Sequence, residues 1–487
     1  MQVWRCLATS LRSPVWIVVA EGGQRLGIGI DFGTTNSAAA VYDGNEVALV
    51  ELEGYHEIVP SATYIDRDLQ TKVGQRAIDE YIAGNTGRTV EMIPEVVGET
   101  SQFVDHSASD NPMPVETVTR KIYGQAVIDS GLQGRLFRGT KRLLGDASVR
   151  RLMVFDHPFR LVALITPLLL HMRGAVDSVA SEVVVDTHRA HLGHPVNFEG
   201  RDRFRNKTAL ARLGEAYKYA GVTEQHFYPE PTAAAVSYLH DAPGIEGELL
   251  LTADFGGGTL DFCVLRHRGS DFEVVTTHGV GLGGDHIDQL LFRKLLFPLL
   301  GEGEMWRRRG MDREIETRFP FEEYEDLLLN WAVTYTLNQN RYTTPVMACI
   351  EQGAVGAHKF RRLRELIKQN LSYLVFQAIK DFKAELSETD EAVLDIPEID
   401  VDERLSRGEF EVLIAHVLQG FERALEETLA MASLQEQDID IVLRTGGSSL
   451  IPAVRRILDV RFPGRVVEHD PFTSVAAGLA IADYHCR

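Results

Sequence analysis

Hydrophobic positions near the start of the chain fall into two short runs separated by a polar turn. The first run covers residues 26–30, the turn is Asp31-Phe32-Gly33-Thr34-Thr35-Asn36, and the second run covers residues 37–41. Short apolar runs bounded by turn residues are typical of β-strands. The pattern predicts a β-hairpin with an acidic residue and small hydroxyl residues at its tip.

The same pattern returns in the second half of the chain. An apolar run at 249–253 leads into Asp254-Phe255-Gly256-Gly257-Gly258-Thr259, and a second apolar run at 260–265 follows. This repeat predicts a duplicated architecture in which two α/β lobes present facing loops. Two such loops could grip one ligand between the lobes.

Several segments carry apolar residues at helical spacing. They cover residues 204–220, 232–239, 361–386, 452–460 and 473–482. In contrast, the stretch 87–120 contains three prolines and shows no clear period, so we expect an inserted surface segment there.

These elements predict two lobes. The first is expected at 26–247, with the insert at 87–120, and the second at 248–470, with a helical subdomain at 300–385. A closing helix at 471–487 is expected to return to the first lobe. We expect residues 1–25 to form a disordered extension.

The composition is that of a globular protein, with 44% hydrophobic and 25% charged residues. The 50 basic and 70 acidic residues give a net charge of −20, which argues against non-specific binding to nucleic acids or anionic membranes. The longest apolar stretch, 161–170, contains Thr166 and Pro167 and predicts a core helix, not a membrane span. Four widely spaced cysteines argue against a disulfide framework or a structural zinc site and fit a cytoplasmic location.

The two hairpin loops carry the chemistry of a phosphate site. Glycine lets backbone N–H groups approach an anion, and the hydroxyls of Thr34 and Thr35 can donate to phosphate oxygens. Asp31 and Asp254 stand at strand ends, where a carboxylate can hold Mg²⁺ directly or through water. Two unrelated glycine turns are the alternative, but they would have to share the Asp-Phe-Gly string by chance.

Other candidate residues have ordinary explanations beside the functional ones. Gly283-Gly284-Asp285 precedes an apolar helix whose N-terminus suits an anion, although a glycine-rich helix start explains it equally well. Gly446-Gly447-Ser448 could pack against a ribose or a base, or simply connect a strand to a helix. Taken alone, Lys141 is typical of a surface lysine, and Glu230 of an acid at a helix N-terminus.

The whole set of motifs resembles the nucleotide-binding domain of the DnaK-type heat-shock chaperones, within the actin, hexokinase and chaperone ATPase superfamily. The resemblance covers the chain from about residue 26 to its end. The string at 193–198, Gly-His-Pro-Val-Asn-Phe, is also similar to the short YegD-like branch. The motifs follow the family's order, namely Asp31-Phe32-Gly33-Thr34-Thr35-Asn36-Ser37, Glu230-Pro231-Thr232-Ala233-Ala234-Ala235, Asp254-Phe255-Gly256-Gly257-Gly258-Thr259-Leu260-Asp261, Gly283-Gly284-Asp285 and Gly446-Gly447-Ser448.

The resemblance implies an α/β, actin-like ATPase fold with two RNase-H-like lobes, and ATP or ADP with Mg²⁺ in the cleft between them. It assigns Asp31 and Asp254 to the shell of the metal, through water. The catalytic residues that it implies are Lys141, Glu230, Asp254 and Thr259. The nucleotide-binding residues that it implies are Asp31, Gly33, Thr34, Thr35, Asn36, Gly256, Gly257, Gly258, Asp261, Gly283, Gly284, Lys383, Ser387, Gly446, Gly447 and Ser448.

The adenosine end of the site departs from the family pattern. Two arginines usually sandwich the adenine, and the matching positions here are Ala384 and Leu450, while the family's helix acid near the ribose falls on Lys380. Guanidinium stacking contributes on the order of 1 kcal/mol, so we expect ATP to bind more weakly than in other members. Up to Arg487 we find no acidic-leucine linker and no β-rich peptide-binding domain.

The sequence therefore predicts a cytoplasmic ATP-binding protein of the DnaK type, a slow Mg²⁺-dependent ATPase without the peptide-binding domain. The resemblance leaves open a protein client or a co-chaperone as a partner, and we expect neither a nucleic acid nor a membrane. Two alternatives are an actin-like structural protein and a small-molecule kinase on the same fold. Lys141 and the threonine of the second loop argue against the first, and the lack of a candidate acceptor base argues against the second.

Overall fold

The structure is a computed structural model whose chain divides into two compact units. Unit 1 comprises residues 1–79, 136–287 and 408–487, and unit 2 comprises residues 80–135 and 288–407. The predicted extension at 1–25 lies outside the described residues except for Arg25, and so does the predicted lobe boundary at residue 247, which stays a prediction. The described residues are 25–104, 116–129, 131–180, 187–198, 204–241, 249–268, 271–309, 314–353, 356–470 and 473–485.

The first sheet of unit 1 begins with the first predicted hairpin. β1 (Gly27–Phe32) pairs antiparallel with β2 (Asn36–Tyr42) and parallel with β12 (Arg189–His194). Five of the six residues of β1 are buried, as expected of a strand covered on both faces. The sheet is completed by β13 (Glu224–Pro229) beside β12, and by β3 (Val47–Leu49) and β4 (Ile58–Pro60) beside β2.

The second sheet of unit 1 repeats this topology. β14 (Leu249–Phe255) pairs antiparallel with β15 (Leu260–Arg268) and parallel with β21 (Ile441–Thr445). β16 (Asp271–Val280) extends the hairpin, and β22 (Val466–Glu468) lies parallel to β21 at the other edge. Each sheet is thus a hairpin to which two parallel strands are added beside the first strand. The predicted duplicated α/β fold is confirmed.

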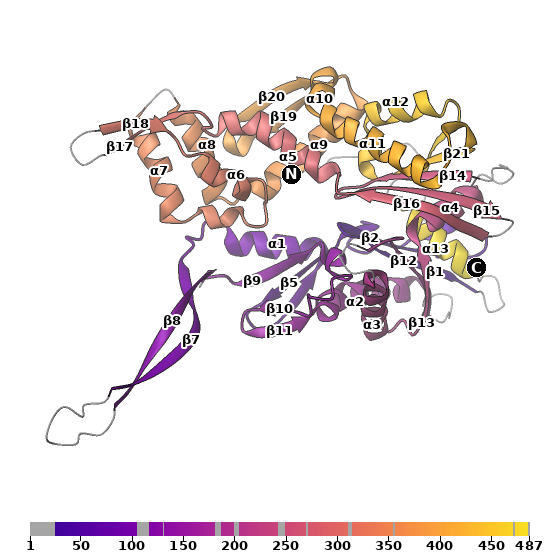
Figure 1. Cartoon of the computed structure of the whole chain (residues 1–487), viewed down its shortest axis with the longest axis horizontal. Helices are drawn as coiled ribbons and strands as arrows, with labels where there is room; N and C mark the ends of the chain where they lie inside the picture. Colours follow the sequence, from indigo (N-terminus) through magenta and orange to yellow (C-terminus); the bar gives the residue numbers. More distant parts are fainter. Residues whose placement is uncertain are drawn as a thin grey trace. The chain divides into compact units, whose positions relative to one another are not determined.

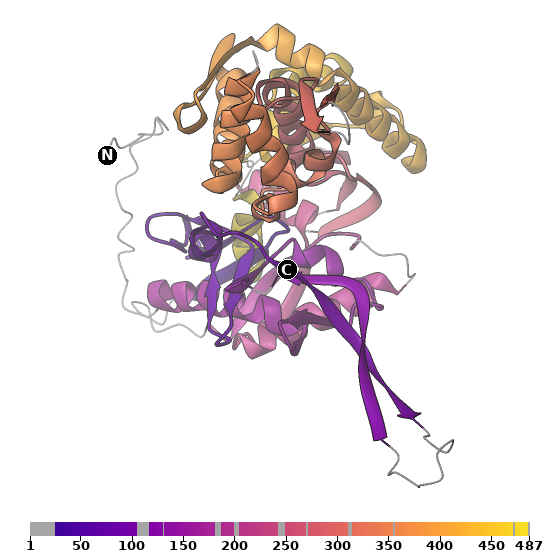
Figure 2. The same ribbon diagram turned by 90° about the vertical axis from the view of Figure 1, so that its left-hand side faces the viewer.

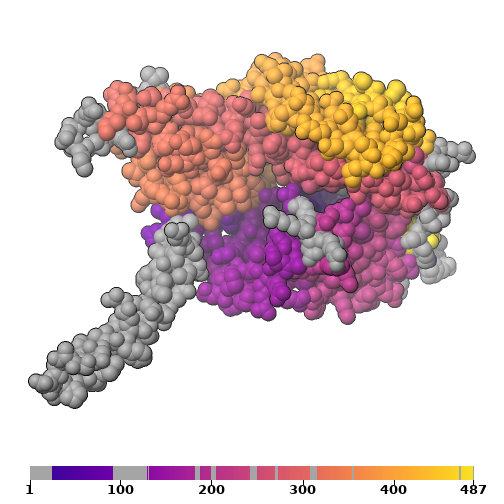
Figure 3. Space-filling model, in the orientation of Figure 1, coloured from indigo at the N-terminus to yellow at the C-terminus, as the bar shows by residue number. Residues whose placement is uncertain are grey.

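Helices cover the faces of both sheets (Figure 1). α2 (Leu161–Ala180) and α3 (Arg205–Tyr219) pack on the first sheet, and α11 (Ala415–Ala432) packs on the second, with α12 (Pro452–Arg461) beside it. In Figure 3 the yellow surface of α11 and α12 adjoins the surface of the second sheet. α4 (Glu230–Asp241) and α13 (Ser474–Tyr484) pack on each other, and α13 also contacts β1, β2 and β12.

α13 is rich in small residues because it approaches its neighbours very closely. A Cβ atom added to Gly478 would lie 1.8 Å from the carbonyl oxygen of Ala233 in α4. A Cβ atom added to Gly29 in β1 would lie 2.3 Å from the carbonyl oxygen of Ala476. Contacts between backbones at this distance exclude any larger side chain. The closing helix therefore lies directly on the first sheet.

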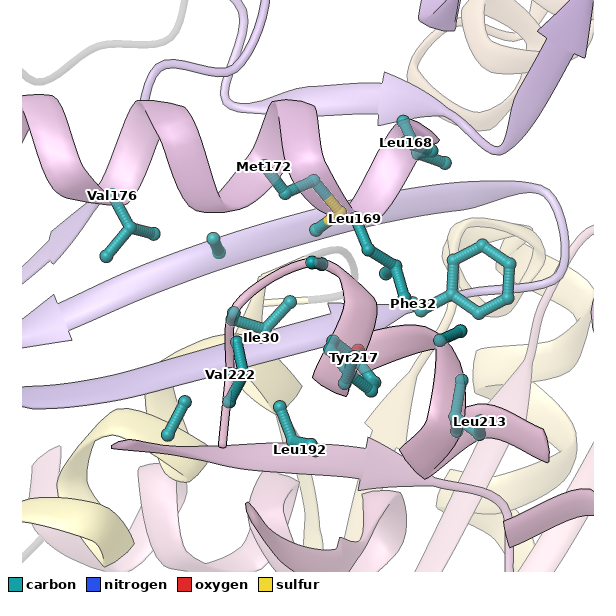
Figure 4. Packing of buried hydrophobic residues seen from close by; sticks show 14 of the residues in the cluster. Ile30, Phe32, Leu168, Leu169, Met172, Val176, Leu192, Leu213, Tyr217 and Val222 are labelled. Atoms are coloured by element: carbon teal, nitrogen blue, oxygen red, sulfur yellow. The ribbon is translucent and has the colours of Figure 1, made fainter. Parts of the chain in front are cut away.

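The core of the first sheet lies between its strands and the helices α2 and α3 (Figure 4). Apolar residues of α2 recur at the spacing of one helical face, and Leu168, Met172 and Val176 join Ile30 and Tyr217 in this core. Among the described helices, α2 alone has the length and mean hydropathy, 1.3, of a membrane span. Because its apolar face packs on the sheet, the predicted core helix is confirmed, and it extends well beyond residue 170.

The remaining elements of unit 1 are short. β10 (Arg151–Val154) and β11 (His157–Arg160) form a hairpin. β5 (Ala62–Asp66) pairs with β6 (Thr71–Val73) on one side and with β9 (Gly134–Arg138) on the other. The further helices are α1 (Gly74–Asn85), α5 (Gly284–Leu291) and α10 (Arg407–Leu413), each of which crosses or borders the boundary with unit 2.

Unit 2 is mainly helical. The prediction of one continuous amphipathic stretch at 361–386 is wrong. Asn370 adopts a left-handed conformation with φ 51° and separates two helices there. The helices are α6 (Glu322–Leu328), α7 (Asn340–Glu351), α8 (Ala357–Lys368) and α9 (Ser372–Glu388). Two hairpins accompany them, β17 (Met305–Arg309) with β18 (Glu314–Arg318), and β19 (Glu391–Ile396) with β20 (Val401–Ser406).

The predicted insert at 87–120 contains most of a long β-hairpin (Figure 2). β7 (Met92–Val104) pairs antiparallel with β8 (Glu116–Asp129) along its whole length. Pro94 stands at an irregularity of the register, where a strand tolerates proline, so the lack of a clear period at 87–120 did not reveal these strands. Residues 105–115 of the insert lie outside the described residues.

Asp483 ties α13 to the first sheet through a buried carboxylate. Its Oδ2 accepts a hydrogen bond from the backbone N–H of Ile28 at 3.1 Å. Its Oδ1 lies 2.8 Å from Nδ1 of His191 and accepts a hydrogen bond from Nε of Arg189 at 3.0 Å. Burial alone would raise the pKa of Asp483, but the hydrogen bonds from His191 and Ile28, and the charge of Arg189, hold it below the ordinary value.

We expect Asp483→Ala to lower the free energy of unfolding by about 3 kcal/mol at pH 7, because it leaves buried donors without a partner. Since the folded pKa lies below the unfolded value, the contribution is present above about pH 4 and is lost as the pH falls through the folded pKa. Urea unfolding of both proteins at pH 7 and at pH 3 measures this difference. Asp459→Ala, in an exposed pair with Arg455, is the control and should cost about 0.5 kcal/mol or less. Equal losses for the two variants at pH 7 would contradict the assignment.

Candidate functional site

Three charged side chains meet at one edge of the first sheet. Nζ of Lys141 lies 2.6 Å from Oε1 of Glu230 and 3.9 Å from Oδ1 of Asp31. Lys141 is only 5% exposed. A lysine is almost never buried to this extent unless it is paired. The surface-lysine interpretation is therefore wrong for Lys141, and its partner is an acid 89 residues further along the chain.

The strand order explains why these side chains meet. Asp31 lies near the end of β1, and Glu230 follows directly after β13 as the first residue of α4. β1, β12 and β13 run parallel, so their carboxyl ends lie at the same edge of the sheet. Lys141 reaches this edge from the short helix η1 (Thr140–Leu143). Gly193, at the end of β12, lies between the acids, since a Cβ atom there would be 3.1 Å from Oδ1 of Asp31 and 3.4 Å from Cγ of Glu230.

Burial and the neighbouring charges shift the pKa values of these side chains. Burial raises the pKa of Asp31 to about 7, while the charge of Lys141 opposes the rise and that of Glu230 adds to it. Burial lowers the pKa of Lys141, but the attraction of Glu230 and Asp31 outweighs burial, and the pKa ends above its ordinary value. Lys141 is therefore a fixed positive charge at neutral pH.

A second aspartate of the site, Asp254, belongs to the second hairpin. Asp254 stands opposite Asp261 in the pairing of β14 with β15. Burial raises the pKa of Asp254 to about 7, and the charges of Asp261, Glu230 and Asp31 add to the rise. These acids are thus close enough to repel one another, and the two Asp-Phe-Gly hairpins contribute to one electrostatic centre.

The glycine loop of the second hairpin supports the loop that follows β16. The backbone N–H groups of Gly284 and Asp285 donate to the carbonyl oxygens of Gly256 at 3.0 Å and Gly257 at 2.7 Å. A Cβ atom on Gly283 would lie 2.3 Å from the carbonyl oxygen of Gly257, so only glycine fits there. The helix N-terminus at Gly284 therefore uses these two donors to hold the second loop.

The loop after β21 packs on the same hairpin. Gly446 has φ 79°, and a Cβ atom on it would lie 2.4 Å from Oδ1 of Asp254. Both the backbone conformation and the close approach require glycine. The hydroxyl of Ser448 donates to the carbonyl oxygen of Gly256 at 3.1 Å. Gly446-Gly447-Ser448 is thus more than a connection between two elements, because it holds Asp254 and the second loop in place.

The first and second loops also lie close together. A Cβ atom added to Gly257 would be 3.6 Å from Oγ1 of Thr35. Arg142, the residue after Lys141, lies over the second loop, since a Cβ atom on Gly258 would be 1.8 Å from its Nη2. Our sequence analysis did not single out Arg142, and its position next to Lys141 is the signal that could have found it. Of the other predicted loop residues, Gly33, Thr34 and Thr259 are half-buried and Asn36 is exposed.

The two candidate residues for the adenosine end lie in unit 2, on α9. Lys383 forms a close ion pair with Asp288, which is 1% exposed. The hydroxyl of Ser387 donates to the carbonyl oxygen of Lys383 within the helix, at 3.1 Å. Both side chains thus have partners within their own unit, and their contacts with a nucleotide stay a prediction.

A pocket of about 670 Å³ in unit 1 opens beside the acids, within the range of small-molecule sites. Glu230, Asp254 and Thr259 line it, together with Asp261 from the outgoing strand. Asn197 and Arg205 contribute polar groups from the loop after β12 and from α3. The predicted catalytic acids and the predicted threonine therefore face one cavity.

The carboxylates of Asp31 and Asp254 fit a divalent cation that keeps most of its water. Oδ1 of Asp31 is buried and accepts no hydrogen bond from any described residue. A cation beside these carboxylates would offset the burial and the repulsion that raise both pKa values. The described part of the chain holds no group of three or more His, Cys, Asp or Glu side chains that could bind a metal directly. Mg²⁺, which retains waters and needs few carboxylates, suits such a site.

The same residues fall inside the segments that match a known protein family. The family model described as Hsp70 protein matches residues 27–143, 158–299 and 362–483, which is well over half of the chain. The chain belongs to the Hsp70 family. Every catalytic and nucleotide-binding residue predicted for this Hsp70 chain lies within the matched segments.

Curated relatives of this Hsp70 chain carry chaperone or heat-shock names. The chaperone protein dnaK of Cyanidioschyzon merolae is 25% identical over 465 residues, covering 93% of this chain and 61% of the relative. The heat shock 70 kDa protein BIP3 of Oryza sativa subsp. japonica is 27% identical over 462 residues, covering 93% and 56%. The chaperone protein DnaK of Thermus thermophilus is 25% identical over 466 residues, covering 93% and 60%. The chain thus spans 56–61% of the length of these relatives.

Family membership confirms the predicted actin-like ATPase fold. Hsp70 proteins bind ATP or ADP, generally with Mg²⁺, so the predicted cofactors agree with the family. In this Hsp70 chain the structure brings Lys141, Glu230 and Asp31 together and packs the glycine loops around Asp254. The role of each residue stays a prediction.

Proposed function

We propose that this Hsp70-family chain binds ATP and ADP with Mg²⁺ and hydrolyses ATP slowly, as a chaperone-type ATPase of the cytoplasm. The observation that carries the proposal is the buried ammonium of Lys141, held 2.6 Å from Glu230 beside Asp31. Phosphoryl transfer requires positioning and charge neutralisation more than covalent chemistry. A permanent positive charge between acids, next to glycine loops, suits that requirement.

In this proposal each residue has a defined task. Lys141 neutralises charge on the γ-phosphate and positions the attacking water, and Glu230 and Thr259 orient that water. Asp31 and Asp254 would hold Mg²⁺ through its waters, and the bound ion would neutralise phosphate charge. The N–H groups and hydroxyls of the two hairpin loops bind phosphate oxygens. The change between ATP and ADP would open and close the lobes, and a client or co-chaperone would respond to that motion.

Titration calorimetry with ATP, ADP and GTP in Mg²⁺, followed by single-turnover and steady-state hydrolysis, tests the proposal. We expect ATP and ADP to bind and ATP to be hydrolysed slowly without an acceptor molecule. Sedimentation of polymer that requires ATP would favour the actin-like structural alternative. Turnover that depends strongly on one added metabolite would favour the kinase. Failure of all three nucleotides to bind would overturn the proposal.

The adenosine end should limit affinity. Ala384 and Leu450 stand where the family has arginines, so we expect Leu450→Arg to tighten ATP binding about fivefold, the gain from one guanidinium stacked on the base. Calorimetric dissociation constants of both proteins for ATP measure this change. Val460→Arg adds the same charge at a position of α12 that is 80% exposed, and it should leave the affinity unchanged. Equal effects of the two substitutions would show that net charge, not stacking, is responsible.

A further inference from the structure

Arg212 in α3 binds four backbone carbonyl oxygens of the segment that follows Lys141. Nη1 of Arg212 donates to three of them, at 3.3, 2.9 and 2.8 Å, and Nη2 donates to the fourth at 2.9 Å; in this order they belong to Leu143, Leu144, Asp146 and Val149. A guanidinium presents five donors in a fixed planar arrangement, so one side chain can hold several carbonyl groups at once. Arg212 therefore ties the backbone of residues 143–149 to α3.

The backbone around Lys141 consists of short turns. Lys141 is the second residue of η1, which is a single 3₁₀ turn. After it, the N–H groups of Leu144, Asp146 and Val149 each donate to the carbonyl oxygen three residues before, at 3.2–3.3 Å. Isolated turns of this kind are weak, because each fixes several dihedral angles for one hydrogen bond. The position of Lys141 therefore depends on contacts from outside the segment.

α3 provides a rigid support for these hydrogen bonds. Its buried residues Leu213 and Tyr217 lie in the core of the first sheet (Figure 4). Arg212, next to Leu213, is half-buried. The side chain of Leu144 is buried in the same core cluster, so the segment is held both by an apolar side chain and by its carbonyl groups. The core of the first sheet is thus connected through Arg212 to the backbone that carries Lys141.

Leu144 links Arg212 directly to Lys141. The N–H group of Leu144 donates to the carbonyl oxygen of Lys141 at 3.2 Å, and the carbonyl oxygen of Leu144 accepts the hydrogen bond from Arg212 at 2.9 Å. At the other end of the lysine, Nζ lies 2.6 Å from Oε1 of Glu230. The lysine side chain is flexible, so its ammonium stays in place only if its backbone does. Loss of the hydrogen bonds from Arg212 would release that backbone.

We propose that Arg212 is a positioning residue for hydrolysis, which holds residues 143–149 so that the ammonium of Lys141 stays beside its two acids. Both terminal nitrogens of Arg212 donate to backbone carbonyls, so Arg212 acts through Lys141 and not on the nucleotide. This role rests on the proposed ATPase function. It adds to the site a residue from α3, which lies 71 positions after Lys141 in the chain.

Arg212→Met, which keeps the apolar part of the side chain and removes the donors, tests this role. We expect kcat for ATP hydrolysis to fall about 100-fold, as when a catalytic group is misplaced by about 1 Å. KM for ATP should stay within about twofold, because the loops that bind phosphate are unchanged. In the Lys141→Ala background the same substitution should cause no further fall in the single-turnover rate, because two residues that act as a unit are not additive.

Arg465→Met is the matched control. Arg465, the residue before β22, likewise donates to two backbone carbonyl oxygens, those of Glu436 at 2.9 Å and Ile439 at 2.6 Å. Its partners are not part of the segment that carries Lys141. We expect both arginine variants to have a lower Tm than the wild type, because each leaves carbonyl groups without their donor. Only Arg212→Met should also lose kcat.

The outcomes separate a positioning role from a purely structural one. An unchanged kcat in Arg212→Met would overturn the role of Arg212 and leave the ATPase proposal intact, and so would a fall that persists in full in the Lys141→Ala background. If Arg212→Met does not fold, Arg212→Lys, which keeps the charge with fewer donors, takes its place, and a wild-type kcat in that variant would be equally decisive. Absence of hydrolysis in the wild type would overturn both proposals.

Discussion

Lys141→Ala is expected to reduce ATP hydrolysis about 1,000-fold, the upper range for the loss of one charged group that stabilises a transition state. ATP binding should persist, because the glycine loops and hydroxyls that bind phosphate are separate from Lys141. Hydrolysis should fall because Lys141 is a buried, permanently charged group that lies next to both Glu230 and Asp31. Single-turnover hydrolysis and calorimetry of the same preparation measure the two effects separately.

The control for this variant is another lysine in an ion pair. Nζ of Lys359 in unit 2 lies 2.7 Å from Oε1 of Glu304. Lys359→Ala removes a similar pair and should leave turnover at the wild-type rate. Hydrolysis by Lys141→Ala at the wild-type rate would refute the mechanism. If Lys141→Ala does not fold, Lys141→Met, which retains the apolar part of the side chain, replaces it in the same measurements.

Asp254→Asn should abolish Mg²⁺-dependent hydrolysis and at the same time stabilise the nucleotide-free protein. The amide has the shape of the carboxylate but carries no charge, so it cannot hold the metal shell. It also relieves the repulsion from Asp261, Glu230 and Asp31, and replacing a buried charge in this way stabilises proteins by roughly 1–3 kcal/mol. When a buried acid is needed for activity but destabilises the fold, its replacement is expected to lower activity and to raise the free energy of unfolding together.

The pH dependence of unfolding gives a second test of Asp254. Its folded pKa is about 7, above the unfolded value, so the folded state binds more protons between about pH 4 and pH 7. The stability of the wild type in EDTA should therefore fall as the pH rises through this window, and Asp254→Asn should show a smaller fall. Asp459→Asn, on the exposed face of α12, should retain the full wild-type slope. An identical slope in Asp254→Asn and the wild type would contradict the raised pKa.

Local sequence was a good guide to the hairpins and the loops. The two Asp-Phe-Gly strings lie at the tips of β1–β2 and β14–β15, as predicted, because a strand, a glycine turn and a second strand are determined by neighbouring residues. Local sequence was a poor guide to secondary structure where a single residue ended a helix or disturbed a strand pattern. Asn370 breaks the stretch predicted to be one helix, and Pro94 concealed the strand β7.

The sequence by itself determined the duplicated hairpins, the closing small-residue helix and the family, because these depend on short strings and their order. The tertiary structure alone decided that Lys141 is buried against Glu230 and that Gly446 contacts Asp254. Such contacts join residues far apart in the chain, and their distances follow from the order of strands in a sheet. Burial then sets the charge of each group, which no local pattern of residues records.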